Sequence, residues 1–209
     1  MEFQAETRQL LDIVTHSLYT DKDIFLRELV SNASDALEKL RHLQTTNQVE
    51  GSVSDVPLEI RIDTDEVGST ITITDTGVGM TRDELISNLG TIARSGSKNF
   101  VKELQMAQSG DGPSKGIIGR FGVGFYSTFM VGSKVEVRTR SAKPGEADKA
   151  FVWTSDGTGT FEVVDLPEEI RQNRGSSIVI HLSEEHWDFA SEAKVEEILK
   201  RYSNFVNFP

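Results

Sequence analysis

The sequence predicts an α/β fold of the α+β kind, a two-layer sandwich in which helices cover a mixed, mostly antiparallel sheet. Apolar residues recur at helical spacing in the N-terminal part, whereas later apolar segments are short and alternate with polar residues. Helical and strand patterns do not alternate regularly, as they would in a doubly wound parallel fold. The chain has 209 residues, enough for one sizeable core, so one domain is expected.

Two amphipathic helices and a hairpin are expected in the first third of the chain. Apolar residues repeat at helical spacing over 10–18, and a longer helix is expected over 22–44. In segments 58–62 and 70–74, isoleucines alternate with polar residues. Such alternation predicts an antiparallel hairpin with one buried face.

A short helix and a long loop are expected next. Thr81 and Glu84 have the spacing of a capping box, and Gly90 is placed to end the helix. The sequence then turns polar and rich in glycine and serine, apart from a weakly helical stretch over 100–106. We interpret residues 89–119 as a lid rather than a linker between domains.

The rest of the chain predicts a buried helix over 123–131 and a final amphipathic helix with apolar residues in phase from Val195 to Phe205. Trp153 and Trp187 are expected to be core or surface anchors. Four strands with apolar alternation are expected between these helices, at 134–139, 150–154, 160–164 and 177–182.

Composition and charge exclude several classes of function. The formal net charge is −11, which repels nucleic acid, although oriented amides and a metal ion can still bind a nucleotide locally. No apolar segment approaches the roughly 20 residues of a membrane-spanning helix. The absence of cysteine excludes disulfides, cysteine zinc sites and thiol nucleophiles. The first residues suit neither a secretory signal nor a transit peptide.

Four polar residues fall at positions i, i+4, i+7 and i+11 of the expected long helix and line one narrow stripe: Glu28, Asn32, Asp35 and Lys39. The stripe borders the apolar face and is expected to be partly sheltered, whereas Arg27 and Glu38 lie on the opposite, solvated side. This spacing suits a helix flank with pairing between successive turns. It also suits a carboxylate base next to an amide metal ligand.

Asp75 directly follows the expected strand over 70–74, and Gly77 and Gly79 come after it. A carboxylate at a strand end, with glycines that permit close approach, can accept a hydrogen bond from an exocyclic amine. An ordinary Asp-x-Gly turn has the same pattern. The motif alone leaves both interpretations open.

Residues 119–127 place small side chains immediately before a helix, where free amides and the positive end of the helix dipole attract phosphate. The glycine spacing differs from the dinucleotide-binding fingerprint, and the Lys-Ser or Lys-Thr pair of a P-loop is missing. The segment is a candidate phosphate site that needs independent support.

That support comes from four motifs in one order along the chain: Glu28-x3-Asn32-x2-Asp35, Asp75-x-Gly77-x-Gly79, Gly119-x-Phe121-Gly122-x-Gly124 and Gly175-Ser176. The order resembles the ATPase superfamily of heat-shock chaperones, type II topoisomerases, mismatch-repair proteins and histidine kinases. Residues 24–36, 88–96 and 121–127 resemble the ninety-kilodalton heat-shock chaperones at almost every position. Residues 2–7 and Arg94 are most similar to the mitochondrial branch, with the bacterial form next.

The resemblance spans nearly the whole chain and implies a Bergerat-type ATP-binding fold, with one N-terminal nucleotide-binding domain over 1–209 and no middle or C-terminal dimerisation domain. It implies ATP or ADP with Mg²⁺ as cofactors, and a lid over 89–119 that closes and exposes a dimerisation surface. The implied partners are a second copy of the full-length protein, client proteins and co-chaperones, without nucleic acid or membrane insertion. The implied location is the mitochondrial matrix, with bacterial or eukaryotic cytoplasm as the alternative.

The resemblance also implies roles at the adenine end. Asp75 would accept the adenine amino group, assisted by a water near Gly79 and by the Ser176 hydroxyl. Asn88 and Asp35 would lie near the sugar. Apolar walls would come from three residues that suit a core equally well: Met80, Leu89 and Phe125. Further ATP contacts are expected from Ala36, Lys39, Arg94, Ser95, Gly96, Gly119, Arg120, Phe121, Gly122, Val123 and Gly124.

At the phosphate end, the resemblance assigns Asn32 to Mg²⁺, which takes hard oxygen ligands and keeps several waters. Glu28, one turn earlier, would be the catalytic base that orients the attacking water and accepts its proton. Two residues depart from the family pattern. Arg120 stands where Gln is usual, and either tightens phosphate contact or points to solvent; Ser176 stands where Thr is usual, but keeps the hydroxyl.

Three other functions fit parts of the pattern. A nucleotide-responsive binding module with negligible hydrolysis fits because family members recruit a catalytic Arg from a middle domain. Phosphotransfer of the histidine-kinase type is disfavoured, since none of the four histidines lies in a recognisable phosphoacceptor helix. A role in DNA topology or repair is disfavoured by the charge of −11.

Overall fold

The structure of the chain is a computed structural model. It describes residues 1–3, 7, 11, 22–46, 56–90, 124–146, 148–167, 173–202 and 206–209. Nearly all of the expected helix over 10–18, most of the lid over 89–119 and the phosphate segment up to residue 123 lie outside the described residues. The predictions for those three segments therefore stay predictions.

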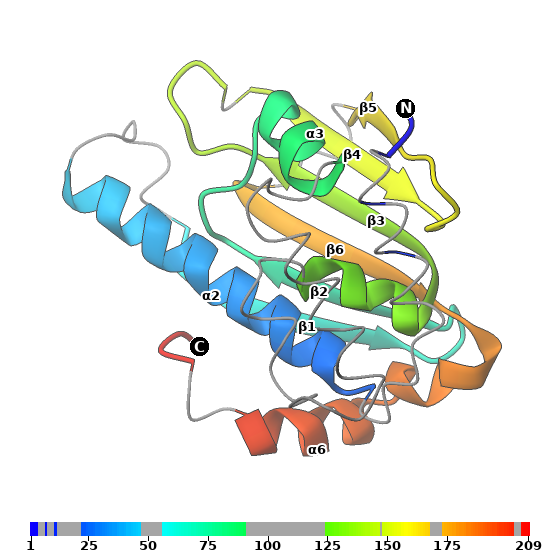
Figure 1. Cartoon of the computed structure of the whole chain (residues 1–209). Coiled ribbons are helices and arrows are strands. Elements are labelled where there is room, and N and C mark those ends of the chain that lie inside the picture. The colour runs from blue at the N-terminus through cyan, green and yellow to red at the C-terminus, as the bar shows by residue number, and fades with distance from the viewer. Residues whose placement is uncertain are drawn as a thin grey trace, which may run out of the picture.

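A six-stranded sheet forms one layer of the fold, in the strand order β1-β2-β6-β3-β4-β5 (Figure 1). Its strands are β1 (Ile60–Asp65), β2 (Thr70–Asp75), β3 (Gly132–Arg140), β4 (Ala150–Ser155), β5 (Glu162–Asp165) and β6 (Gly175–Leu182). Every pairing between these described strands is antiparallel. The predicted hairpin and the four later strands are confirmed, with shifts of a few residues at their ends.

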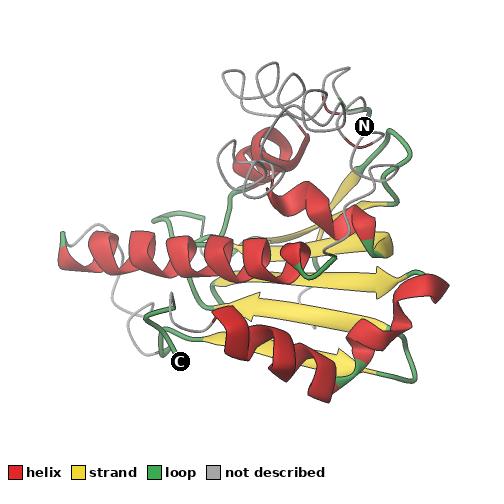
Figure 2. Cartoon of the chain, turned by 60° about the horizontal axis from the view of Figure 1, so that its bottom comes forward, coloured by secondary structure: helices red, strands yellow, loops and turns green. Residues whose placement is uncertain are grey.

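Helices form the second layer, in front of the strands in Figure 1. They are α2 (Ile24–Thr45), α3 (Arg82–Gly90), α6 (Glu192–Tyr202) and the 3₁₀ helices η2 (Gly124–Met130) and η4 (Glu184–Ala190). Figure 2 shows α2 lying over the sheet and running roughly along the direction of the strands, with η4 and α6 near the β1 edge. The predicted two-layer sandwich is confirmed, as are the predicted helices that fall within the described residues, and the short buried helix before β3 is of the 3₁₀ type.

The long helix α2 is held on the sheet by its apolar face, whose residues recur every three or four positions. Phe25, Leu29, Leu37 and Leu40 are fully buried. Burying one such side chain contributes about 1.5–3 kcal/mol. All seven residues of η2 are also buried, and this short helix packs against α2. The two helices therefore form one rigid unit above the sheet.

Aromatic side chains cluster around Trp153 of β4, which is fully buried. The Trp153 ring centroid lies 5.5 Å from that of Phe125 and 5.9 Å from that of Phe161. The ring of Phe3, near the N-terminus, lies 6.1 Å away. Aromatic pairs at such distances add about 0.5–1.5 kcal/mol beyond burial. Trp187, in contrast, is 52% exposed, so one tryptophan is a core residue and the other a surface residue.

We expect Trp153→Ala to lower the free energy of unfolding by about 3–5 kcal/mol, because it leaves a cavity among the surrounding aromatic rings. Urea unfolding followed by circular dichroism measures this loss. Trp187→Ala is the matched control and should change the free energy of unfolding by no more than about 0.5 kcal/mol. Equal losses in the two variants would contradict the position of Trp153 at the centre of the core.

Candidate functional site

Asp75 is a buried carboxyl at the end of β2. Alternation along β2 places Ile71, Ile73 and Asp75 on the buried face and the threonines between them on the other face. Oδ1 of Asp75 accepts the N–H of Gly77 at 2.8 Å, and the N–H of Ser176 also donates to this carboxyl. Burial raises the pKa of Asp75 to about 7, although both N–H donors oppose the rise. The carboxyl is therefore poised between its neutral and ionised forms at neutral pH.

Strand β6 brings hydroxyl groups to this carboxyl, because it lies between β2 and β3. Its register places Ser176 opposite Asp75 on one side and opposite Thr139 on the other. The Thr139 and Ser176 hydroxyl oxygens are 3.0 Å apart. Thr139 Oγ1 also donates to the Gly175 carbonyl at 3.1 Å and accepts the Met80 N–H at 3.0 Å.

Thr139 is fully buried and is absent from the residues that the sequence predicted for the site. A signal for it exists in the strand pattern. Val135, Val137 and Thr139 occupy the buried face of β3, so a hydroxyl ends a run of apolar positions. Asp75 ends the buried face of β2 in the same way. Both site residues could therefore be found as the polar residue at the last buried position of an otherwise apolar strand face.

The turn after β2 is fixed from both sides. The Val78 N–H donates to the Ala36 carbonyl of α2 at 3.2 Å, and the Val78 carbonyl accepts the Ala142 N–H at 2.8 Å. Gly79 has a φ of 60°, and the Arg140 carbonyl occupies the space that a Cβ would need. Only glycine meets both conditions. The predicted Asp-x-Gly-x-Gly segment is thus a turn, but one with a buried carboxyl and a fixed backbone.

Glu28 of α2 is buried, with 9% of its surface exposed. Gly124, the first residue of η2, packs against it so closely that an added Cβ would come within 2.6 Å of Oε2. Oε1 accepts a hydrogen bond from Arg27 Nη2 at 3.2 Å. The expectation that Arg27 is solvated holds in part, because its side chain is 38% exposed but also reaches the neighbouring Glu28 carboxylate. Glu28 therefore lies against the last glycine of the predicted phosphate motif.

The other polar residues of the stripe are accessible. Asn32, Asp35 and Lys39 are all exposed, so the expected shelter holds only for Glu28. An exposed polar or charged side chain is hydrated by solvent, so these three residues do not need hydrogen bonds within the chain. They remain available to a ligand that lies along α2.

Helix α2 connects the two ends of the candidate site. Gly124 packs on Glu28, and Gly77 packs on Ala36, where an added Cβ would come within 2.7 Å of the Ala36 carbonyl carbon. Glu28 and Ala36 are separated by about 12 Å along the helix axis, at 1.5 Å per residue. The Asp75 carboxyl accepts a hydrogen bond from Gly77, so it belongs to the second end. The site therefore has two separate polar ends on one helix.

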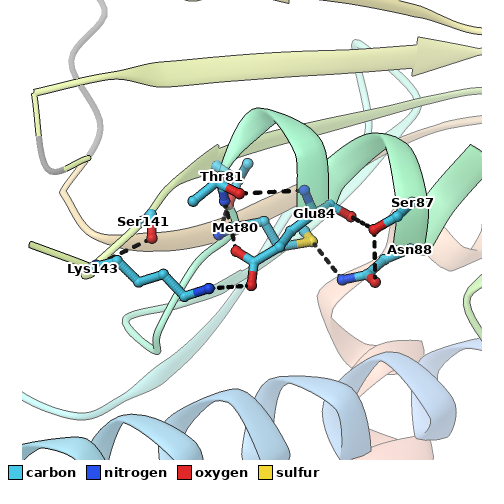
Figure 3. A network of polar contacts seen from close by, with 8 residues as sticks. Met80, Thr81, Glu84, Ser87, Asn88, Ser141 and Lys143 are labelled. Atoms are coloured by element: carbon cyan, nitrogen blue, oxygen red, sulfur yellow. Dashed lines mark hydrogen bonds and ion pairs between the residues drawn. The ribbon is translucent and has the colours of Figure 1, made fainter. Parts of the chain in front are cut away.

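A network of polar contacts holds α3 beside the turn (Figure 3). Thr81 and Glu84 form the predicted capping box, in which Glu84 Oε2 accepts the Thr81 N–H at 3.0 Å and Thr81 Oγ1 accepts the Glu84 N–H at 3.3 Å. Lys143 Nζ donates to Glu84 Oε1. Burial opposes ionisation of Glu84, but the hydrogen bonds from Lys143 and Thr81 outweigh it and lower the pKa of Glu84. Asn88 Nδ2 donates to Met80 Sδ at 3.8 Å, so these two predicted site residues lie together.

Two predicted apolar walls belong to the core. Leu89 and Phe125 are buried in the main cluster, and Met80 is half-buried against it. The Tyr126 hydroxyl donates to the Leu89 carbonyl at 2.8 Å and joins η2 to the end of α3. These residues stabilise the walls of the site through their packing in the core. Their contact with a ligand stays a prediction.

A protein-built metal centre is absent from the described part of the chain, where no three histidine, aspartate or glutamate side chains cluster. The accessible Asn32 amide, one turn after the Glu28 carboxylate, fits a cation such as Mg²⁺ that keeps several waters and is held mainly by substrate phosphates. The remaining predicted ATP contacts lie outside the described residues: Arg94, Ser95, Gly96, Gly119, Arg120, Phe121, Gly122 and Val123.

Within the described ranges, every helix is too short or too polar to cross a bilayer.

The chain is similar to curated chaperones over its entire length. It is 49% identical to the mitochondrial TNF receptor-associated protein 1 homolog of Dictyostelium discoideum and 54% identical to the mitochondrial Heat shock protein 75 kDa of Rattus norvegicus. It is 51% identical to Chaperone protein HtpG of Desulfitobacterium hafniense. Each match covers 100% of this chain, but only 28%, 28% and 33% of the respective relative.

A family profile matches as well, over residues 20–176, which include every site residue named above. The profile is that of the histidine kinase-, DNA gyrase B-, and HSP90-like ATPases. The resemblance that the motifs predicted is thereby confirmed. The chain belongs to this ATPase family, on its HSP90 branch, and is an ATPase domain of that family.

Proposed function

We propose that the chain binds ATP along α2 and supplies the catalytic carboxylate for its hydrolysis in an ATP-dependent chaperone. One observation carries the proposal. Two buried carboxyl groups, Glu28 of α2 and Asp75 at the end of β2, lie at the two ends of one stretch of α2, each next to a glycine that packs directly on this helix. This arrangement suits an elongated ligand that has a nucleobase at one end and phosphates at the other.

The adenine end is formed by strands and the turn. Asp75 in its ionised form is an acceptor for the adenine amino group, and its two backbone donors orient it. The hydroxyls of Ser176 and Thr139 lie next to it and can donate to a ring nitrogen directly or through a water near Gly79. Asn88 lies beside Met80, at the start of the path toward the sugar. Five of these six residues were predicted from the sequence, and Thr139 was not.

The phosphate end is formed by α2 and η2. Glu28 is the base that orients the attacking water and accepts its proton, since it is buried against Gly124 yet belongs to the accessible stripe. Asn32 would hold Mg²⁺, which when bound neutralises phosphate charge. Backbone N–H groups of residues 122–125 would stabilise the charge that develops during hydrolysis.

The rest of the chaperone cycle is also a proposal. We propose that the lid over 89–119 closes over ATP and drives N-terminal dimerisation, and that hydrolysis resets a homodimer that handles client proteins with co-chaperones. The names of the relatives, which include a chaperone and a heat shock protein, support this cycle. The two mitochondrial names support the mitochondrial matrix as the location, and the similarity to HtpG supports bacterial or other cytoplasm as the alternative.

A second candidate function is a nucleotide-responsive binding module with negligible hydrolysis of its own. The observation that favours it is the length of the match, because the chain spans only about a third or less of the length of the curated relatives. A catalytic residue contributed by another domain would then be missing from the isolated chain. The two candidates differ in turnover and share the same ATP site.

We expect Glu28→Ala to keep ATP affinity within about threefold of the parent and to reduce turnover by at least about a hundredfold, since it removes the base. Asp75→Asn should abolish detectable ATP binding, because the amide offers a donor in place of an acceptor. Calorimetry and a phosphate-release assay on the full-length protein measure the two effects. Glu66→Ala, at the exposed hairpin end, is the control and should leave both unchanged. Turnover of Glu28→Ala at the parent rate would refute the assignment of the base.

Asp75 should also make the stability of the nucleotide-free protein depend on pH. Its pKa in the folded state, about 7, lies above its ordinary value of 3.8, so its contribution to stability is complete below about pH 4 and is lost as the pH rises through 7. From about pH 5 to about pH 8, the parent should lose about 2–3 kcal/mol more unfolding free energy than Asp75→Asn. Urea unfolding at both pH values tests this difference. Asp63→Asn, an exposed carboxyl on β1, should keep the slope of the parent.

The isolated chain should bind ATP as tightly as the full-length protein, within about threefold, but hydrolyse it at least about tenfold more slowly, because an arginine from another domain would be missing. Single-turnover and steady-state assays on both proteins compare the rates. Equal rates would mean that all catalytic groups lie within these 209 residues and would remove the second candidate function.

A further inference from the structure

A cavity lies at the end of the sheet where β2 finishes and β6 begins. Its volume is about 180 Å³, and it is lined by residues from three segments, 56–61, 74–76 and 173–174, nearly all of them polar or charged. A cavity of this size has room for several water molecules. It can therefore hold a small hydrated ion but not a nucleoside triphosphate.

Arg174 is the buried cation of this cavity, with 6% of its surface exposed. Its Nη2 donates to the Val56 carbonyl at 2.6 Å, whereas Nε and Nη1 are buried and lack a hydrogen-bond partner within the described ranges. Burial lowers the pKa of the Arg174 guanidinium, yet arginine remains protonated at neutral pH. A buried cation with two unmet donors is strongly unfavourable, and native proteins nearly always supply a partner.

The carboxyl groups that line the cavity do not supply that partner. Glu59 pairs with Arg61 at 3.6 Å, so these two charges compensate each other. Asp75 directs Oδ1 to the Gly77 N–H, and burial raises its pKa to about 7, so it carries only part of a negative charge at neutral pH. Among the described residues, no hydrogen bond joins either carboxyl group to Nε or Nη1 of Arg174. The positive charge of Arg174 is therefore only partly compensated by the carboxyl groups that line the cavity.

We propose that this cavity binds a small oxyanion, of the size of phosphate or sulfate, on Arg174. A guanidinium offers directional N–H donors that match the oxygens of an oxyanion, and the anion supplies the charge that the cavity lacks. Thr74 and Asn173 add polar groups to the same lining. The site is separate from Glu28 and Gly124, where the phosphates of ATP are proposed to bind, and only Asp75 borders both.

Thermal unfolding of the nucleotide-free protein in phosphate and in chloride, at matched ionic strength, tests the proposal. Phosphate at tens of millimolar should raise the Tm of the parent by about 2–4 °C relative to chloride. Arg174→Met should lose this difference. Arg82→Met is the matched control, because it removes one exposed positive charge outside the cavity, and it should keep the difference. Any general salting effect of phosphate is common to all three proteins.

Two results would overturn the proposal. One is an equal phosphate effect in Arg174→Met and the parent, which would place the anion elsewhere, for example at the phosphate end of the ATP site. The other is no phosphate effect in the parent, which would mean that water fills the cavity. If Arg174→Met fails to fold, phosphorus NMR of inorganic phosphate, with the parent and with Arg174→Lys, replaces the thermal unfolding test. The phosphate line should broaden in the presence of the parent, and the broadening should be saturable. It should be at least about threefold weaker with Arg174→Lys. Nucleotide is absent throughout, so the outcome does not depend on the proposed ATP site.

Discussion

The burial of a carboxyl group at the end of a strand is the constraint on which the candidate site depends. Taking a carboxylate out of water is unfavourable unless donors replace the solvent. The N–H groups of Gly77 and Ser176 are those donors, and even with them the pKa of Asp75 rises to about 7. The tight turn after β2 and the position of β6 beside β2 both serve this requirement, because each places one N–H at the carboxyl.

Helix α2 then sets the scale of the site. Its apolar face is buried along its length, so the distance between Glu28 and Ala36 is fixed by helix geometry and not by loops. Close packing of glycines at both positions brings η2 and the turn after β2 onto the same helix. The residues between them, Asn32 and Asp35, stay exposed. The result is a preformed frame with accessible polar groups in its middle, which reduces the ordering that a ligand must impose.

The sequence allowed the elements and most of the candidate residues to be predicted, because those signals are local. The hairpin, the capping box at Thr81 and the apolar face of α2 all follow from spacing along the chain. Thr139 was missed because its role arises from the neighbour that β6 gives it. The contact between Arg27 and Glu28 was not predicted, because helix periodicity does not determine the direction of a long, half-exposed side chain. Arg174 was missed for a similar reason, since no local pattern distinguishes a buried arginine from a solvated one.

The insertion of β6 between β2 and β3 has a consequence for how the chain folds. Asp75 and Ser176 are about a hundred residues apart in sequence but directly opposite in the sheet. Closing so long a loop costs entropy that only the completed strand pairing offsets, which makes this step slow. During synthesis β6 is the last of the described strands to leave the ribosome, so the carboxyl lacks its second donor until residue 176 has emerged. The candidate site around the Asp75 carboxyl is therefore completed late, together with closure of the sheet.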